Sequence, residues 1–179
     1  MHATPQASMA LLNTQLACGT ASVTWMIIDL CCLGVPSFDG IMNGSLAGLV
    51  AITPCAGYVD TTGAFIVGFL GGAITSQGVK IKDYFNFDDA LDAFGIHGVA
   101  GVAGMVMSGL LAKSEISGAP SDQQGIFYGG SFKFLGVQLV AIVFTISWGC
   151  LFTAIILKLV DKVIGLRVSQ HKELIGLDA

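Results

Sequence analysis

The feature of this sequence that most constrains its fold is the distribution of its charged residues. Asp, Glu, Lys and Arg make up 11% of the 179 residues, against about 25% in a typical soluble domain. They are confined to a few short stretches, and the apolar runs between them approach or exceed the ~20 residues that an α-helix needs to cross a bilayer. Because a chain in lipid must satisfy its own backbone hydrogen bonds, we expect an all-α integral membrane bundle.

Hydropathy predicts five membrane-spanning helices followed by a short tail. The second, at 18 residues, contains Gly44 and Gly48 at a spacing typical of close packing between membrane helices. The third repeats this spacing with Gly68 and Gly72. The helices are expected at residues 5–33, 36–53, 62–79, 92–112 and 134–159, giving a membrane domain over 1–160 and a tail over 161–179.

Lysine and arginine residues predict which side of the membrane each connection occupies. Lys113 and Lys133 lie on one side, whereas six of the eight basic residues share the other. Cytoplasmic connections carry an excess of Lys and Arg, so we expect a multi-pass protein of the cell membrane with a cytoplasmic C-terminus and an N-terminus outside. The six residues are Lys80, Lys82, Lys158, Lys162, Arg167 and Lys172.

The first predicted helix is too polar to face lipid on all sides. Unpartnered polar groups are costly in hydrocarbon, so we expect its polar side to meet other helices, water or a pore. The residues concerned are Asn13, Thr14, Gln15, Thr20, Ser22 and Thr24.

Composition argues against several other classes of function. The net charge is −4 and the chain has no basic patch, so nucleic acid is not an expected partner. The cysteines lack CxxC or Cys/His ligand spacing, which favours small buried hydrophobes over metal ligands or disulfides. No cofactor is expected. The five cysteines are Cys18, Cys31, Cys32, Cys55 and Cys150.

A single histidine, His97, lies inside a long apolar run. In a regular α-helix the residues on its side are small, so we expect the imidazole in a groove formed with the first and second helices. Such a groove suits close helix packing or a narrow conduit. Spacing alone leaves three roles open: a pore residue, a buried hydrogen-bonding group between helices, and a haem ligand. The small residues are Ala93, Ala100, Gly101, Gly104 and Ser108.

Asp92 stands where the N-cap of this helix is expected. Its carboxylate could accept from the amide of Phe94 or Gly95, and its charge suits the positive end of a helix. We therefore expect Asp92 to have a structural role.

Three stretches closely resemble the ammonium transporter (Amt/Mep/Rh) family, in the order and spacing of that family. They are GSLAGLVAITPCAGYV, DDALDAFGIHGVAGVAGMVMSGLLA and VIGLRVSQHKELIGLD. The resemblance implies a transporter and not an enzyme, with eleven spans built largely from two inverted five-helix halves and subunits assembled as homotrimers. It also implies that His97 is the second of two pore histidines, and that Asp92 is the aspartate opening its helix.

The resemblance covers only about the last five of the eleven spans. The first pore histidine and the outer recruitment site of the family have no counterpart in this sequence. We therefore expect a C-terminal portion of a transporter that is inactive alone. A non-transporting structural or regulatory membrane subunit remains the alternative.

The substrate implied by the resemblance is ammonium, and physical chemistry favours moving it as neutral ammonia. Burying a bare ammonium ion in an apolar pore costs on the order of tens of kcal/mol by Born solvation. A His97 imidazole kept neutral by desolvation could exchange hydrogen bonds with ammonia. Ala93, Gly101 and Gly104 would leave room for the molecule beside it.

The tail resembles the cytoplasmic segment through which family subunits contact one another. Its apolar residues favour packing over solution, and Arg167 has donors for a carboxylate at Asp83, Asp88 or Asp89. Gly165 would permit the turn out of the last helix. We expect the tail to dock on residues 80–87, and the alternative is an amphipathic end lying on lipid headgroups.

Overall fold

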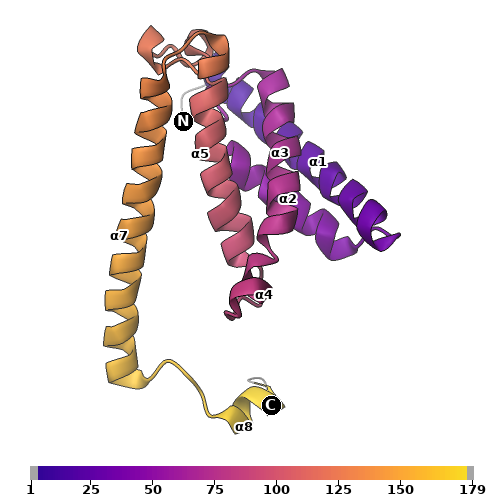
Figure 1. Cartoon of the computed structure of the whole chain (residues 1–179), viewed down its shortest axis with the longest axis vertical. Helices are drawn as coiled ribbons and strands as arrows, with labels where there is room; N and C mark the ends of the chain where they lie inside the picture. The colour runs from indigo at the N-terminus through magenta and orange to yellow at the C-terminus, as the bar shows by residue number, and fades with distance from the viewer. Residues whose placement is uncertain (1–3, 177–179) are drawn as a thin grey trace. The chain divides into compact units, whose positions relative to one another are not determined.

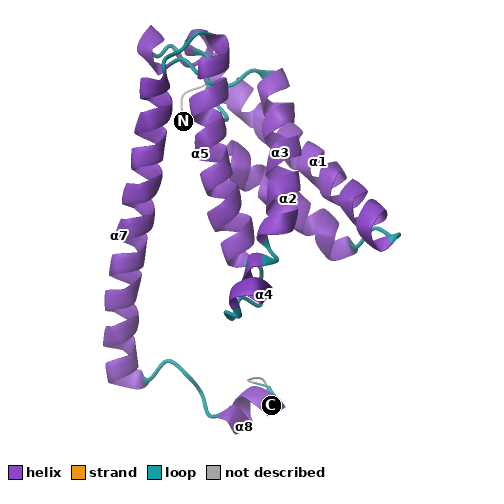
Figure 2. Cartoon of the chain, viewed as in Figure 1, coloured by secondary structure: helices purple, strands orange, loops and turns teal. Residues whose placement is uncertain are grey.

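The computed structural model describes residues 4–176, and every regular element within that range is a helix (Figure 1, Figure 2). The all-α prediction is therefore confirmed. The longer helices are α1 (Pro5–Leu33), α2 (Phe38–Ile52), α3 (Thr61–Gly78), α5 (Ala100–Leu111) and α7 (Phe132–Ile164). The short ones are α4 (Ile81–Phe85), the π-helix η1 (Phe94–Val99), α6 (Ser114–Ser117), the 3-10 turns η2 (Ser121–Gln123) and η3 (Ile126–Tyr128), and α8 (Gln170–Ile175).

Four helical segments of the described chain are long and apolar enough to cross a membrane. They are Pro5–Leu33, Thr61–Phe85, Phe94–Leu111 and Phe132–Ile164. They correspond to the first, third, fourth and fifth predicted spans.

The second predicted span is α2, which has 15 residues where 18 were expected. At 1.5 Å per residue it is about 22 Å long, less than the ~30 Å hydrocarbon core. It begins after Ser37, whose Oγ accepts a hydrogen bond from the Gly40 amide at 2.9 Å. It ends two residues before Pro54, which has no N–H to continue the helix.

Internal contacts divide the chain into two compact units, residues 1–140 and residues 141–179. The boundary falls inside α7, whereas the sequence predicts a boundary between membrane domain and tail at residue 160. That functional division stays a prediction. The first unit contains α1 to α5 and the turn that carries His97.

Close helix approach in the first unit depends on glycine. A Cβ added at any of the four predicted packing glycines would lie within 3.0 Å of a carbonyl oxygen of α1, at Ala17 or Ala21. Backbones can approach this closely only where no side chain separates them, so the predicted packing role is confirmed. The four are Gly44 and Gly48 on α2 and Gly68 and Gly72 on α3.

The polar side of α1 meets neighbouring segments at Asn13 and Ser22, as predicted. Its threonine hydroxyls instead donate to carbonyls one turn earlier in α1 itself. Asn13 is fully buried, and its Nδ2 donates to the carbonyls of Ala56 at 2.8 Å and Val59 at 2.7 Å. Ser22 Oγ donates to the Ile41 carbonyl at 2.9 Å. These bonds tie α1 to α2 and to the turn after it.

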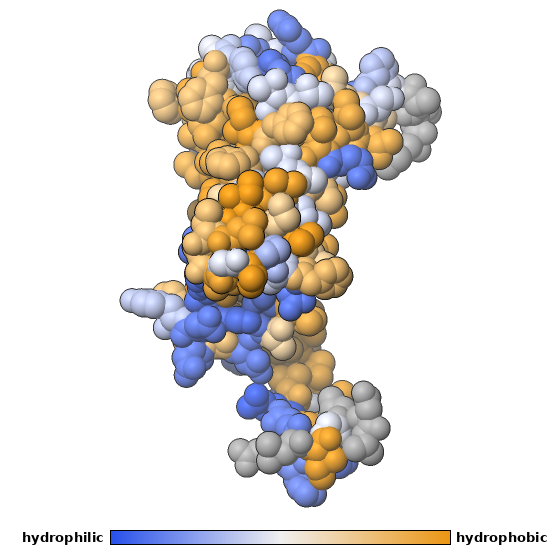
Figure 3. All heavy atoms as spheres, turned by 90° about the vertical axis from the view of Figure 1, so that its right-hand side faces the viewer, coloured by the Kyte–Doolittle hydropathy of each residue, from blue (hydrophilic) through white to orange (hydrophobic). Residues whose placement is uncertain are grey.

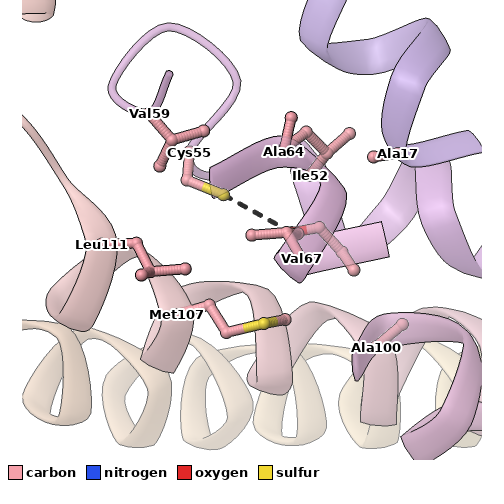
Figure 4. Packing of buried hydrophobic residues seen from close by; sticks show 10 residues of the cluster. Ala17, Ile52, Cys55, Val59, Ala64, Val67, Ala100, Met107 and Leu111 are labelled. Atoms are coloured by element: carbon pink, nitrogen blue, oxygen red, sulfur yellow. Dashed lines mark hydrogen bonds between the residues drawn. The ribbon is translucent and has the colours of Figure 1, made fainter. Parts of the chain in front are cut away.

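The core of the first unit lies where α1, α2, α3 and α5 meet. Figure 4 shows Val67 of α3 and Met107 of α5 in this cluster, together with Cys55 from the turn after α2. Cys55 is fully buried and donates weakly to the Ala51 carbonyl, so it behaves as the small hydrophobe expected. The prediction of buried cysteines is wrong, within this chain, for three that are exposed: Cys31, Cys32 and Cys150.

Many large apolar side chains remain on the surface of the helices, and Figure 3 shows them covering much of one face. α7 has no buried residue over its 33 positions. Side chains of this kind suit contact with lipid tails or with other apolar helices.

Candidate functional site

The helix that carries His97 begins in a sharp turn after α4. Asp89 caps it: the two carboxylate oxygens accept from the amides of Ala93 and Phe94, each at 2.9 Å. Asp92, the predicted cap, instead forms an ion pair with Lys82, with Nζ 2.6 Å from Oδ1.

The capping prediction for Asp92 is therefore wrong, and its backbone explains why. An N-cap residue normally has an extended backbone, which aims its side chain at the amides two and three residues ahead. Asp92 has φ +56°, in the left-handed region, so its side chain points elsewhere. A structural role for Asp92 stays a prediction, now through its ion pair with Lys82.

His97 lies in η1, a π-helix over residues 94–99 that leads into α5. A π-helix closes i→i+5 hydrogen bonds and turns less per residue than an α-helix. In a regular α-helix, two residues seven positions apart project from nearly the same side. A π-helical turn between them rotates one relative to the other. For this reason His97 and Gly104 do not share one side.

The four predicted pore residues divide between two sides of this helix. Ala93 and His97 are exposed, and Gly101 is half-buried. A Cβ added at Gly101 would meet only Val50 Cγ1, at 4.0 Å, so the space beside it is open. These three form the open side of the helix.

Gly104 lies on the packed side, which corrects the prediction that it lines the pore with His97. It is buried, and a Cβ there would overlap the Ala51 carbonyl oxygen of α2. Its role is close packing. Ala100 and Met107 lie on the same packed side, in the core seen in Figure 4.

The prediction that His97 faces a groove formed with α1 and α2 stays a prediction. Within the chain the imidazole is exposed, and the packed side of the helix is the one that contacts α2 and α3.

The sequence model of the Ammonium Transporter Family matches residues 1–179. The chain belongs to this family. Membership places it among transporters rather than enzymes. The ammonium transporter of Aquifex aeolicus (strain VF5) is 39% identical over 175 residues, covering 97% of this chain and 40% of that protein. The one from Bacillus subtilis (strain 168) is 38% identical over 173 residues, covering 96% and 42%.

Solved structures of the family share the fold. The crystal structure of Saccharomyces cerevisiae Mep2 has a TM-score of 0.87 at 33% identity, over 95% of this chain and 39% of that one. Candida albicans Mep2 gives 0.87 at 32% identity, over 96% and 38%. The chain thus spans about 40% of the length of the relatives it matches.

A second ionic cluster, which was not expected from the sequence, ties the far end of α5 to the start of α3. Lys113 Nζ lies 2.6 Å from Asp60 Oδ2 and 4.2 Å from the centre of the Tyr128 ring. Asp60 also accepts from the Gly63 amide at 2.9 Å and so caps α3. This family member therefore has one lysine–carboxylate link near each end of the His97 helix.

The two charges of the Lys113–Asp60 link favour each other. Burial raises the pKa of the Asp60 carboxyl, but the Lys113 hydrogen bond, the Gly63 amide and the Lys113 charge outweigh it, and the net pKa is lowered. The Asp60 hydrogen bond raises the pKa of Lys113, against the opposing effect of burial. Both groups are therefore held in their charged forms.

The tail residues singled out from the sequence lie in the second unit. Gly165 has φ +78° and follows the last residue of α7, which confirms the turn expected there. Arg167 Nε lies 3.9 Å from Glu173 Oε1, within the tail. Docking of the tail on residues 80–87 joins parts of two different units and stays a prediction.

Proposed function

We propose that this chain supplies one wall of an ammonia-conducting pathway in a multi-pass membrane transporter. His97, Ala93 and Gly101 line the pathway in this proposal. The observation that carries it is the division of the His97 helix: its packed side fits tightly against α2, whereas its open side presents an imidazole between small residues.

The chemistry of the open side suits a neutral, hydrogen-bonding cargo. An imidazole offers one donor and one acceptor when neutral, which matches ammonia. The neighbouring alanine and glycine leave space for a molecule of about the size of water. Ammonium itself loses far more hydration energy on entering an apolar conduit, so a proton must be left behind at the entrance.

The exposure of His97 also supports a pathway completed by other protein. An ionisable side chain facing lipid tails is costly, and such residues normally face a bundle interior or a water-filled cavity. The relatives are more than twice as long as the matched region, and transporter sites often lie between two repeated halves. We therefore propose a complete subunit that is longer than this chain, acts as a homotrimer in the cell membrane, and has a cytoplasmic C-terminus.

The experiment grafts this chain onto a complete relative. Its 179 residues replace the matching 40% of the Aquifex aeolicus transporter, and the chimera is expressed in cells that lack ammonium uptake. Growth on low ammonium should be rescued by the chimera and lost with His97→Ala. His171→Ala in the tail is the matched control and should grow normally.

Two results would count against the proposal. Normal growth of the His97→Ala chimera at equal membrane abundance would remove His97 from the pathway. Rescue by the 179-residue chain alone would show that no further wall is needed. Failure of the chimera to transport, despite correct membrane insertion, would favour the alternative of a non-transporting structural or regulatory subunit.

A further inference from the structure

The turn before the His97 helix holds two residues in an uncommon backbone conformation. Asn86 has φ +52° and Asp92 has φ +56°, and they are the two non-glycine residues with positive φ in the described chain. Asn and Asp tolerate this region better than other side chains, but it remains sparsely populated. A residue keeps such a conformation when surrounding contacts hold it there.

Lys82 supplies those contacts from α4. Its ammonium lies 2.6 Å from the Asp92 carboxylate and donates to the Asp89 carbonyl at 3.0 Å. The Asp89 side chain in turn caps the amides of Ala93 and Phe94. One lysine thus touches both acidic residues that define where and in which direction the next helix starts.

Lys82 and Asp92 are sheltered but not sealed from solvent. Their side chains are 27% and 23% exposed, so the pair is better protected than an ordinary surface ion pair. The neighbouring Lys80 differs, because its ammonium donates to the side-chain oxygen of Gln77, at 3.0 Å, and not to the turn before η1. Lys82 therefore contacts the turn before η1, whereas Lys80 contacts the end of α3.

We propose that Lys82 is a positioning residue for His97. The clamp formed by Lys82, Asp89 and Asp92 holds the left-handed turn at Asp92, and that turn sets the start and register of η1. With the π-helical register His97 lies on the open side. Without the clamp, Asp92 relaxes toward an ordinary helical backbone, and a continuous α-helix brings His97 to the side of Gly104, which packs on Ala51.

The clamp matters for transport only if His97 is a pore residue, as proposed above, but its geometry can be tested without transport. The readout is modification of histidine by diethyl pyrocarbonate, quantified by mass spectrometry on the purified full chain in detergent. The modification rate of His97 is divided by that of His171, an exposed histidine of the tail. The ratio cancels differences in reagent and protein concentration.

Lys82→Met should lower the ratio about threefold or more, as expected when a side chain moves from open to packed surroundings. Lys82→Arg keeps the charge and should stay near the wild-type ratio. Lys80→Met is the matched control and should leave the ratio unchanged. Adding Asp92→Gly to Lys82→Met should restore the ratio in part, because glycine adopts positive φ without strain.

An unchanged ratio in Lys82→Met, with normal helix content, overturns the proposal. An equal fall in Lys80→Met overturns it too, because the effect would then follow the loss of any cytoplasmic-side lysine. If Lys82→Met does not fold, Asp92→Asn is measured instead, since asparagine tolerates the turn but lacks the charge. A fall there supports the clamp and an unchanged ratio refutes it, whether or not His97 proves essential for transport.

Discussion

The two sides of the His97 helix use the same kind of residue for opposite purposes. On the packed side, Gly104 has no side chain because the α2 backbone occupies the space where a Cβ would be. On the open side, Gly101 has no side chain although there is room for one, because a Cβ there would meet only Val50 Cγ1, at 4.0 Å. Small residues along a membrane helix therefore mark either close contact or open space. Their neighbours in three dimensions decide between the two.

The largest loss of stability is expected from a substitution on the packed side of the His97 helix. Gly104→Ala places a Cβ onto the Ala51 carbonyl, and overpacking of a tight site costs about 1–3 kcal/mol or more. Gly101→Ala is the matched control: its Cβ has room, and alanine favours a helix by up to about 1 kcal/mol over glycine. Unfolding of both variants in mixed detergent micelles, followed by circular dichroism, compares them directly. Equal destabilisation of the two would erase the distinction between the sides.

The next prediction concerns the open side. Gly101→Leu should leave the unfolding free energy of the chain within about 0.5 kcal/mol, as for a substitution away from packed contacts. In the chimera it should reduce ammonium uptake to background, because the side chain would fill the space beside His97. Uptake and membrane abundance are measured together. Wild-type uptake in this variant would show that the open side does not line the pathway.

Much of the fold could be predicted from the sequence, because hydropathy and helix-breaking residues act locally. The first span was expected at residues 5–33 and α1 occupies Pro5–Leu33. The glycines of α2 and α3 were expected to pack and do so. Both results follow from local rules, in which an apolar run forms a span and two small residues four apart allow helices to approach.

The division of the site could not be predicted in the same way. A helical projection assumes one constant turn per residue, and η1 breaks that assumption between His97 and Gly104. The choice of Asp89 over Asp92 as cap depends on a left-handed turn held by Lys82, which is ten residues from Asp92 in sequence. Two acidic residues three apart give no local signal of which one will cap.

A smaller effect is expected at the end of the packed side where Lys113 binds Asp60. Lys113→Met should lower stability by about 1 kcal/mol at neutral pH, near the upper end for partly exposed pairs. Because the pKa of Asp60 is lowered in the fold, its contribution is present above the usual aspartate range and is lost as the pH falls through the lowered value. The raised pKa of Lys113 keeps the pair intact up to strongly alkaline pH.

Unfolding curves of wild type and Lys113→Met at several pH values measure this link. The difference between them should be constant near neutral pH and shrink in acid, once Asp60 is protonated. Lys133→Met, also on the outer side by the sequence prediction, is the control and should show no such pH dependence. A difference that persists in acid would mean that Lys113 acts through its packing on Tyr128 instead.

The smallest expected effect is at Ser108, the one hydroxyl on the packed side of α5. Its Oγ lies 3.5 Å from the Pro54 carbonyl oxygen, at the outer limit for a hydrogen bond. Ser108→Ala should therefore change the unfolding free energy by less than about 0.5 kcal/mol, below the usual net value of a well-formed bond. Gly104→Ala, on the same side, should cost several times more. A larger loss of stability in Ser108→Ala than in Gly104→Ala would mean that the hydrogen bond to Pro54 holds α5 against α2. The tight fit at Gly104 would then be a consequence of that bond and not the cause of the close approach of the two helices.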